Sequence, residues 1–172
     1  MTPIPFVKND GGRRDSGFRG NAGDCVARAV AIASGMPYKD VYNSLAHGNK
    51  NQRKTKNMQK SGLGKKSARH GIYTKRKWFK DYMKSLGFRW VVTSGIGIES
   101  AKCCSEDIPD GNIIIAKRRH YAAVINGVLN DTYNSTEPRY YTGIENGNEY
   151  RRLTFTNLYG YWIKDERCKI YE

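Results

Sequence analysis

The chain has 172 residues, a hydrophobic content of 38% and a formal net charge of +14 at pH 7. This length fits one domain with a real core, and the sequence has no run of about 18 apolar residues that could span a membrane. The excess of Lys and Arg favours an acidic partner such as nucleic acid and says nothing about the fold.

The N-terminal residues 1–20 contain two prolines, adjacent glycines and a basic pair, which predicts an irregular arm. They lack the basic segment followed by an apolar core that marks a secretory signal peptide. The four cysteines are not regularly spaced, and two of them are adjacent at Cys103-Cys104, which argues against a disulfide framework. A reducing, cytoplasmic compartment is therefore expected.

Residues 19–35 change from a glycine-rich loop to an Ala/Val/Ile run that ends at a glycine. This pattern predicts a helix with Asp24 at the N-cap, Cys25 in the first turn and Gly35 just after the end. The free N–H groups and the dipole of a helix N-terminus favour a thiolate at Cys25. A buried cysteine is more often a small core hydrophobe, so this one residue does not establish catalysis.

A second helix is expected from Pro37 to about Ala46, followed by an exposed basic loop over residues 47–77. From Val41 to Lys80 there are 12 Lys and Arg residues and no Asp or Glu. A solvated basic face and a non-specific nucleic-acid-binding surface both remain open. The candidate phosphate contacts are Lys50, Arg53, Lys54, Lys56, Lys65 and Lys66.

Apolar residues at helical spacing predict an amphipathic helix over residues 78–86, and Phe88 to Thr93 is typical of a strand. The Gly-x-Gly at residues 95–97 lacks a third glycine and is too weak to indicate a nucleotide loop. Cys103-Cys104 lacks the spacing of a zinc site, so no metal and no cofactor are expected.

Residues 112–134 predict a strand followed by a hairpin, because Asn126-Gly127 separates two apolar runs. Such a two-residue turn places Ile125 opposite Val128, and side-chain alternation then puts His120 and Asp131 on the same face. Asn130 points to the other face. Asp131 lies diagonal to His120, within reach of its ring. A thiol, an imidazole and a carboxylate are the elements of a Cys–His–Asp catalytic site.

The remaining residues are expected to form a surface loop over residues 134–150 and two further strands over residues 151–155 and 158–164. With helices in the first half and strands in the second, the fold class is α+β. The sequence predicts a single domain over residues 1–172.

The segments Gly-Asp-Cys25-Val-Ala-Arg-Ala-Val-Ala-Ile-Ala-Ser-Gly and His120-Tyr-Ala-Ala-Val-Ile-Asn-Gly-Val-Leu-Asn-Asp131 resemble the papain-like cysteine peptidase superfamily. They are most similar to its compact members, which include double-glycine-leader peptidases and phage-encoded proteins. The resemblance covers roughly residues 19–45 and 110–135. It implies N-terminal helices carrying the cysteine, packed on a C-terminal antiparallel sheet carrying the histidine and the aspartate. A phage-encoded member would reside in the host cytoplasm or the virion.

The resemblance implies thiolate attack by Cys25, proton transfer by His120 and orientation of that ring by Asp131. Papain has a glutamine before its nucleophile. Here Asn21 is the nearest amide, and it is the candidate oxyanion donor beside the Cys25 backbone N–H. Arg28 could bind a substrate carboxylate, or pair with an acid such as Asp24.

Three functions remain open: a cysteine peptidase, isopeptidase or amidase acting on a protein or peptide substrate; a basic nucleic-acid-associated or virion protein on an inactive papain-like scaffold; and a structural module with a buried Cys25.

Overall fold

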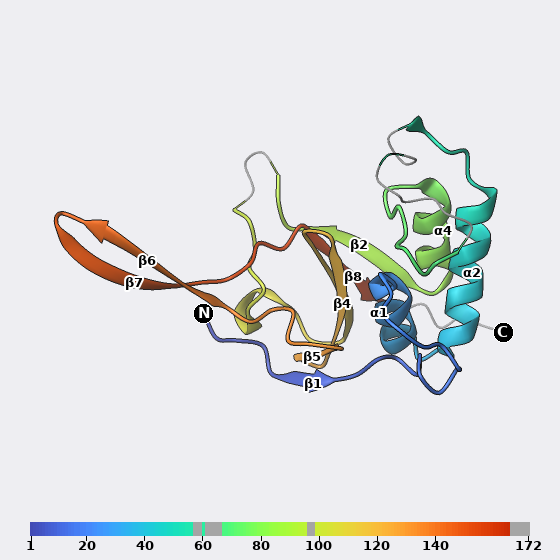
Figure 1. Ribbon diagram of the computed structural model, residues 1–172, viewed down its shortest axis with the longest axis horizontal. Helices are drawn as coiled ribbons and strands as arrows, with labels where there is room; N and C mark the ends of the chain where they lie inside the picture. Colours follow the sequence, from blue (N-terminus) through green and yellow to red (C-terminus); the bar gives the residue numbers. More distant parts are fainter. Residues whose placement is uncertain (57–59, 61–66, 96–98, 166–172) are drawn as a thin grey trace.

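The computed structural model describes residues 1–56, 60, 67–95 and 99–165 and has an α+β architecture (Figure 1). The helices are α1 (Cys25–Ser34), α2 (Tyr38–Asn51), α4 (Lys77–Ser85) and the short 3-10 helix η1 (Ser105–Asp107). The strands are β1 (Phe6–Lys8), β2 (Phe88–Val92), β3 (Asn112–Lys117), β4 (His120–Ile125), β5 (Val128–Asp131), β6 (Arg139–Glu145), β7 (Asn148–Thr154) and β8 (Gly160–Lys164).

A six-stranded sheet in the order β1-β5-β4-β3-β8-β2 forms the centre of the molecule. β1 pairs with β5 in parallel, and the other neighbours are antiparallel. One face of this sheet carries Ile114, Ala123 and Trp162 and is covered by α1 and α4, and α2 packs on the outside of these two helices. The other face carries Ile113, Ile115 and further apolar residues, which form a second core. The sheet is therefore buried on both sides.

Helix α1 is the most deeply embedded helix, because its small side chains allow close approach to β4 and β3. Ala27, Val30 and Ala33 are completely buried. Gly35 ends the helix in the left-handed conformation, with φ of 76°, and its N–H donates to the Ala31 carbonyl. The predicted helix and its glycine stop are confirmed.

The β4–β5 hairpin has the predicted turn and register. Asn126 and Gly127 have φ of 47° and 76°, as a type I′ turn requires. Ile125 pairs with Val128, and the ladder continues to Ala123 opposite Asn130. No bulge shifts this ladder, so the alternation that places His120 and Asp131 together is preserved.

The predicted basic loop begins later than the sequence indicates, because α2 continues to Asn51 instead of ending near Ala46. Gly48 suggests a break, yet it lies inside the helix, where a Cβ would come within 2.3 Å of the Trp78 ring. The glycine thus permits close packing of α2 against Trp78. At the other end of the predicted loop, Ala68 and Ile72 are buried in the main core, so this part is not an exposed loop.

The predicted surface loop over residues 134–150 is wrong, because it contains β6 and the first residues of β7. Residues 151–155 were expected to complete the main sheet, but those in β7 pair with β6 in a separate two-stranded sheet. This hairpin projects far from the body of the molecule (Figure 1). Its turn at Asn146-Gly147 has φ of 52° and 79°, the same signal as at Asn126-Gly127.

Two further observations concern the ends of the chain. The N-terminal arm contains β1, which the sequence did not indicate because its ladder partner β5 lies far away in the sequence. The strand predicted over residues 158–164 is confirmed as β8, between β3 and β2. Among the helices of the described residues, none has the length and apolar character needed to cross a membrane.

Candidate active site

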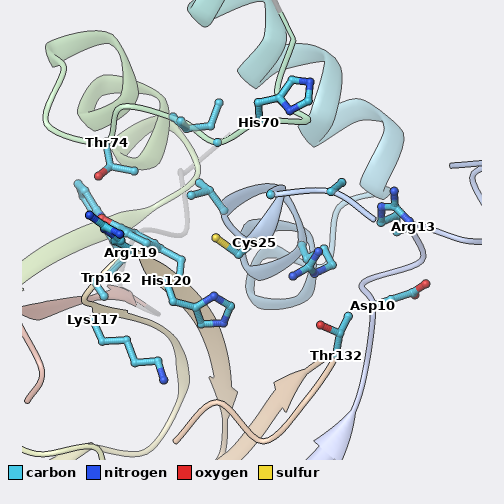
Figure 2. Close-up of a pocket in the computed structure, with 18 of the residues that line it drawn as sticks. Asp10, Arg13, Cys25, His70, Thr74, Lys117, Arg119, His120, Thr132 and Trp162 are labelled. Carbon is cyan, nitrogen blue, oxygen red and sulfur yellow. The ribbon is translucent and has the colours of Figure 1, made fainter. Parts of the chain in front are cut away.

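Cys25 opens α1 and His120 opens β4, so these two residues meet at the ends of their elements. The Cys25 thiol and the His120 imidazole interact closely enough for each to shift the pKa of the other. Figure 2 shows the two side chains next to each other in the middle of a pocket. The structure therefore brings together residues that are far apart in the sequence, a nucleophile at a helix N-terminus and a base at the start of a strand.

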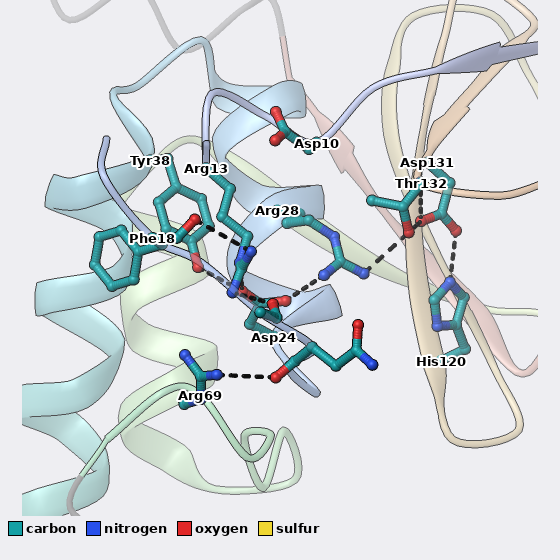
Figure 3. Close-up of polar contacts among 12 residues, drawn as sticks. Asp10, Arg13, Phe18, Asp24, Arg28, Tyr38, Arg69, His120, Asp131 and Thr132 are labelled. Atoms are coloured by element: carbon teal, nitrogen blue, oxygen red, sulfur yellow. Dashed lines mark hydrogen bonds and ion pairs between the residues drawn. The ribbon is translucent and has the colours of Figure 1, made fainter. Parts of the chain in front are cut away.

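Asp131 holds the other side of the His120 ring, with 2.6 Å between its Oδ2 and the ring Nε2 (Figure 3). The carboxylate is 4% exposed, and its Oδ1 accepts the Thr132 backbone N–H at 2.7 Å. Asn130 points elsewhere and accepts a hydrogen bond from Asn9 at 3.0 Å. The prediction that Asp131, and not Asn130, approaches His120 is confirmed.

The three groups shift one another's pKa toward an ion pair. Burial raises the pKa of the Cys25 thiol, but the hydrogen bond and charge of His120, the Tyr121 backbone N–H and the Arg28 charge together lower it below its usual value. Burial lowers the pKa of His120, but its bonds to Asp131 and Cys25 raise it to about 9. Burial also opposes ionisation of Asp131, yet His120 holds the pKa of that carboxyl below its usual range. All of these shifts act toward a thiolate beside an imidazolium.

Asp24 occupies the N-cap position of α1, but within this described helix its side chain makes no capping hydrogen bond. Its buried carboxylate instead accepts from Arg13 Nε at 2.7 Å and from the Tyr38 hydroxyl at 2.6 Å, and it pairs with Arg28. The first turn of α1 contains no acidic residue. Because the Asp24 carboxylate is occupied by these partners and does not bond the free N–H groups of the helix, the positive end of the helix can act on the Cys25 thiolate.

Arg28 connects this buried carboxylate to the catalytic candidates. Its guanidinium pairs with Asp24 on one side and lies 3.9 Å from the Asp131 carboxylate on the other. The side chain is 11% exposed, so both pairs are shielded from solvent. Of the two roles considered for Arg28, the ion pair with Asp24 is the one that the structure shows.

The loop before Cys25 is held by two arginines through its carbonyl groups. Arg69 donates to the Asn21 carbonyl at 3.0 Å, and the Gly23 N–H donates to the Arg69 carbonyl at 2.8 Å. Arg13 donates to the Gly20 carbonyl at 2.9 Å. Asn21 is exposed and lines the same pocket as Cys25. The Cys25 N–H belongs to the first turn of α1, where N–H groups have no acceptor within the helix.

The pocket around Cys25 is an open groove of about 1880 Å³. On one side of Cys25 lie Thr74, Arg119 and Trp162, and on the other lie Asp10 and Thr132 (Figure 2). Tyr133 also lines the groove, and its ring packs against His120 with 5.4 Å between the ring centroids.

No family model, curated protein or solved structure matches this chain. The arrangement of Cys25, His120 and Asp131 must therefore be interpreted by its own geometry.

Several functional candidates escaped the sequence analysis. Arg13 and Tyr38 complete the shell around Asp24, and Arg69 anchors the approach to Cys25. The Tyr121 N–H acts on the thiol through the backbone. These contacts join segments that are distant in sequence, and no periodicity or spacing marks them. Lys117 could have been predicted from the sequence, because it lies at the end of a strand just before His120 and is therefore beside the site.

The candidate nucleic-acid residues divide into two groups. Lys50, Arg53, Lys54 and Lys56 are exposed at or beyond the end of α2, whereas Lys65 and Lys66 lie outside the described residues. In the described part of the chain, no group of at least three His, Cys, Asp or Glu side chains is arranged to hold a metal ion.

Proposed function

We propose that the protein is a cysteine hydrolase of the papain-like type, acting on an amide bond of a protein or peptide. The observation that carries this proposal is the chain of contacts from Cys25 through His120 to Asp131. Each partner shifts the next toward the thiolate–imidazolium state that a cysteine nucleophile needs. The order Cys, His, Asp along the chain and a helix packed on a mostly antiparallel sheet also support it.

The reaction would proceed in two steps that share one geometry. The Cys25 thiolate attacks the carbonyl carbon, and the carbonyl electron pair moves to oxygen, where the Cys25 N–H and the Asn21 side chain are the candidate donors. When the C–N bond breaks, its electron pair leaves with nitrogen, which takes the proton from the His120 imidazolium. A thioester and a free amine result.

Water then completes the cycle. Neutral His120 removes a proton from water as the water oxygen attacks the thioester carbon. The C–S bond breaks, the electron pair returns to Cys25 as thiolate, and the proton remains on His120. Asp131 keeps the ring oriented in both steps through its bond to Nε2, so that Nδ1 faces the thiol side.

The test is turnover of a mixed library of fluorogenic peptidyl amides by the wild type and by variants. Cys25→Ala and His120→Ala should each abolish release of the fluorophore. The control Cys104→Ala, which removes a thiol outside the groove, should keep it. Folding of each variant is checked by circular dichroism. Equal turnover by Cys25→Ala and the wild type would rule out the proposal.

A second candidate function is non-specific binding of nucleic acid through Lys50, Arg53, Lys54 and Lys56. Each side chain is exposed, and none forms an ion pair with a carboxylate of the described residues. Duplex DNA should bind with a negative slope in log affinity against log salt, about 0.9 for each phosphate contacted. Changing all of these residues to Gln should flatten that slope, and no binding at low salt would exclude this function.

A further inference from the structure

The groove around Cys25 has an uneven distribution of charge along its length. Trp162 lies at one end of the groove. Its ring centroid is 6.1 Å from that of Phe79 in α4 and 5.2 Å from that of Trp90 in β2. Lys117 and Arg119 line the groove on the same side of Cys25 as Trp162, and Lys75, Lys80 and Lys84 line it from α4 and the segment just before that helix. The acidic residues that line the groove, Asp10 and Asp15, both belong to the N-terminal arm, which also contributes Lys8, Arg13 and Arg14 and therefore has charges of both signs.

The basic residues at the Trp162 end are not neutralised by the protein. Within the described residues, none of Lys75, Lys80, Lys84, Lys117 and Arg119 forms an ion pair with a carboxylate. By contrast, Arg13 and Arg28, which also line the groove, are both paired with Asp24. Lys8 and Arg14 also form no ion pair among the described residues, but they belong to the arm that contributes Asp10 and Asp15 to the groove, whereas no acidic residue of the described chain lines the groove together with the five cations at the Trp162 end.

Lys117 is the most constrained of these cations. It is partly buried at the end of β3, directly opposite His120 in the β3–β4 ladder. Burial lowers the pKa of its ammonium group more than the charges of Cys103 and Asp131 raise it, and the charge of Arg139 acts in the same direction as burial. A partly buried cation without a carboxylate partner is stabilised when an anion binds next to it. Because Lys117 lines the groove, such an anion would lie within the groove.

We propose that the groove selects an acidic polypeptide, whose Asp or Glu side chains on one side of the scissile bond lie at the Trp162 end. This inference rests on the proposed function only in taking the ligand to be a polypeptide, since Cys25 is arranged for attack on an acyl carbon. The exposed Trp90 and Tyr159, which line the same end, provide apolar surface for the remaining side chains of the substrate.

The test is a binding measurement that does not depend on turnover. Labelled 12-residue peptides are titrated into Cys25→Ala: one with four Glu before a central Gly-Gly, one with four Glu after it, and one with Gln at all of these positions. We expect one of the acidic peptides to bind at least tenfold more tightly than the Gln peptide at 0.1 M salt. The other acidic peptide should bind less tightly.

The groove is then tested by a charge-matched pair of variants in the same background. Lys80→Gln with Lys84→Gln should weaken binding of the preferred peptide about three- to tenfold, because each exposed ion pair contributes a modest factor. Lys39→Gln with Arg89→Gln removes the same charge away from this end of the groove and should leave the affinity within twofold.

Equal affinity for the Glu and Gln peptides would overturn the inference, and so would equal losses in the two double variants. A single-stranded oligonucleotide of the same charge that displaces the acidic peptide and binds more tightly would also overturn it, in favour of a nucleic-acid ligand. The proposed hydrolase activity fails separately, if the wild type cleaves none of the library amides although Cys25→Ala binds the acidic peptide.

Discussion

Two regions of this molecule contain buried thiols, and they differ in what surrounds the sulfur. Cys103 and Cys104 are fully buried, and Cys103 lies in the apolar cluster on the sheet face opposite α1. Burial raises the pKa of Cys103 to about 11, and that of Cys104 also lies above its usual value because of burial. Cys25 is also largely withdrawn from water, yet its pKa is lowered, because His120 and Arg28 supply positive charge there.

The comparison separates the effect of burial on a thiol from the effect of the groups around it. Desolvation acts in the same direction on all of these thiols and on its own makes each of them less reactive. Cys25 differs in two ways. It lies at the positive end of a helix, and it is next to a base, His120, that is held by the Asp131 carboxylate. The reactivity of Cys25 should therefore depend on a few specific contacts, each of which can be removed in turn.

The largest effect is expected from His120→Ala. Without the imidazole, desolvation becomes the dominant influence on Cys25 and raises the pKa of the thiol, so its alkylation rate at pH 7 should fall about 100-fold. The measurement is iodoacetamide modification followed by mass spectrometry. His47→Ala, which removes an exposed histidine of α2, is the matched control. A rate unchanged by His120→Ala would mean that His120 does not activate the thiol.

Asp131→Ala should have a smaller effect, about tenfold on the same alkylation rate, because the carboxylate acts only through the His120 ring. Asp131→Asn keeps a hydrogen-bond acceptor for Nε2 and should fall between the wild type and Asp131→Ala. Asp81→Asn, at an exposed carboxylate of α4, provides the control. If Asp131→Ala were as damaging as His120→Ala, the carboxylate would have a more direct role.

The coupling should also appear in the pH dependence of stability. In the folded protein the pKa of His120 is about 9, above the value of 6.5 for a free side chain. The stabilisation that His120 gives the folded state is therefore complete below pH 6.5 and is lost as the pH rises through about 9. Cys25 opposes this trend, because a lowered thiol pKa gives stabilisation that grows with pH up to the ordinary value of 9.0. In Cys25→Ala this opposing contribution is removed, and the His120–Asp131 pair still raises the pKa of His120.

Urea unfolding of Cys25→Ala at pH 6 and pH 9 tests this balance. We expect the free energy of unfolding to fall by about 1 kcal/mol over this interval, as partial loss of a favourable His120–Asp131 pair predicts. The double variant Cys25→Ala with His120→Gln should show a smaller change. A pH-independent stability in Cys25→Ala would show that the folded protein does not raise the pKa of His120.

The smallest effect on the thiol is expected from Tyr38→Phe. This change removes one hydrogen bond to the buried Asp24 carboxylate and should lower the free energy of unfolding by about 1–2 kcal/mol. Arg13 and Arg28 still hold Asp24, so Cys25 alkylation should stay within twofold of the wild type. A large loss of reactivity would mean that the Asp24 cluster sets the position of Cys25.

The parts of the fold that were predictable depend on local signals. The α1 helix, its Gly35 stop and the Asn126-Gly127 turn each follow from neighbouring residues, and the turn alone places His120 with Asp131. The β6–β7 hairpin has the same Asn-Gly signal at Asn146-Gly147 but lacks alternating apolar runs, so its composition suggested a loop. The length of α2 was underestimated because Gly48 serves packing against Trp78, which only the tertiary structure reveals.

The residues of the candidate site also divide into those with a local sequence signal and those set by tertiary contacts. Cys25, His120 and Asp131 could be proposed from residue type, position in an element and register. The shell around Asp24 could not, because a buried carboxylate gains its partners from Arg13 and Tyr38 through tertiary contacts without a sequence pattern. The charge of the groove likewise depends on which surfaces of α4, β3 and the arm face the same space.

The most direct test of the central claim is the pH profile of modification at each cysteine of the intact protein. Iodoacetamide labelling for a fixed short time, from pH 5 to pH 11, is followed by digestion and mass spectrometry. The account predicts that Cys25 is modified first, with a midpoint below 9.0, whereas Cys103 stays unmodified until pH approaches about 11. A Cys25 midpoint at or above that of Cys103 would contradict the account.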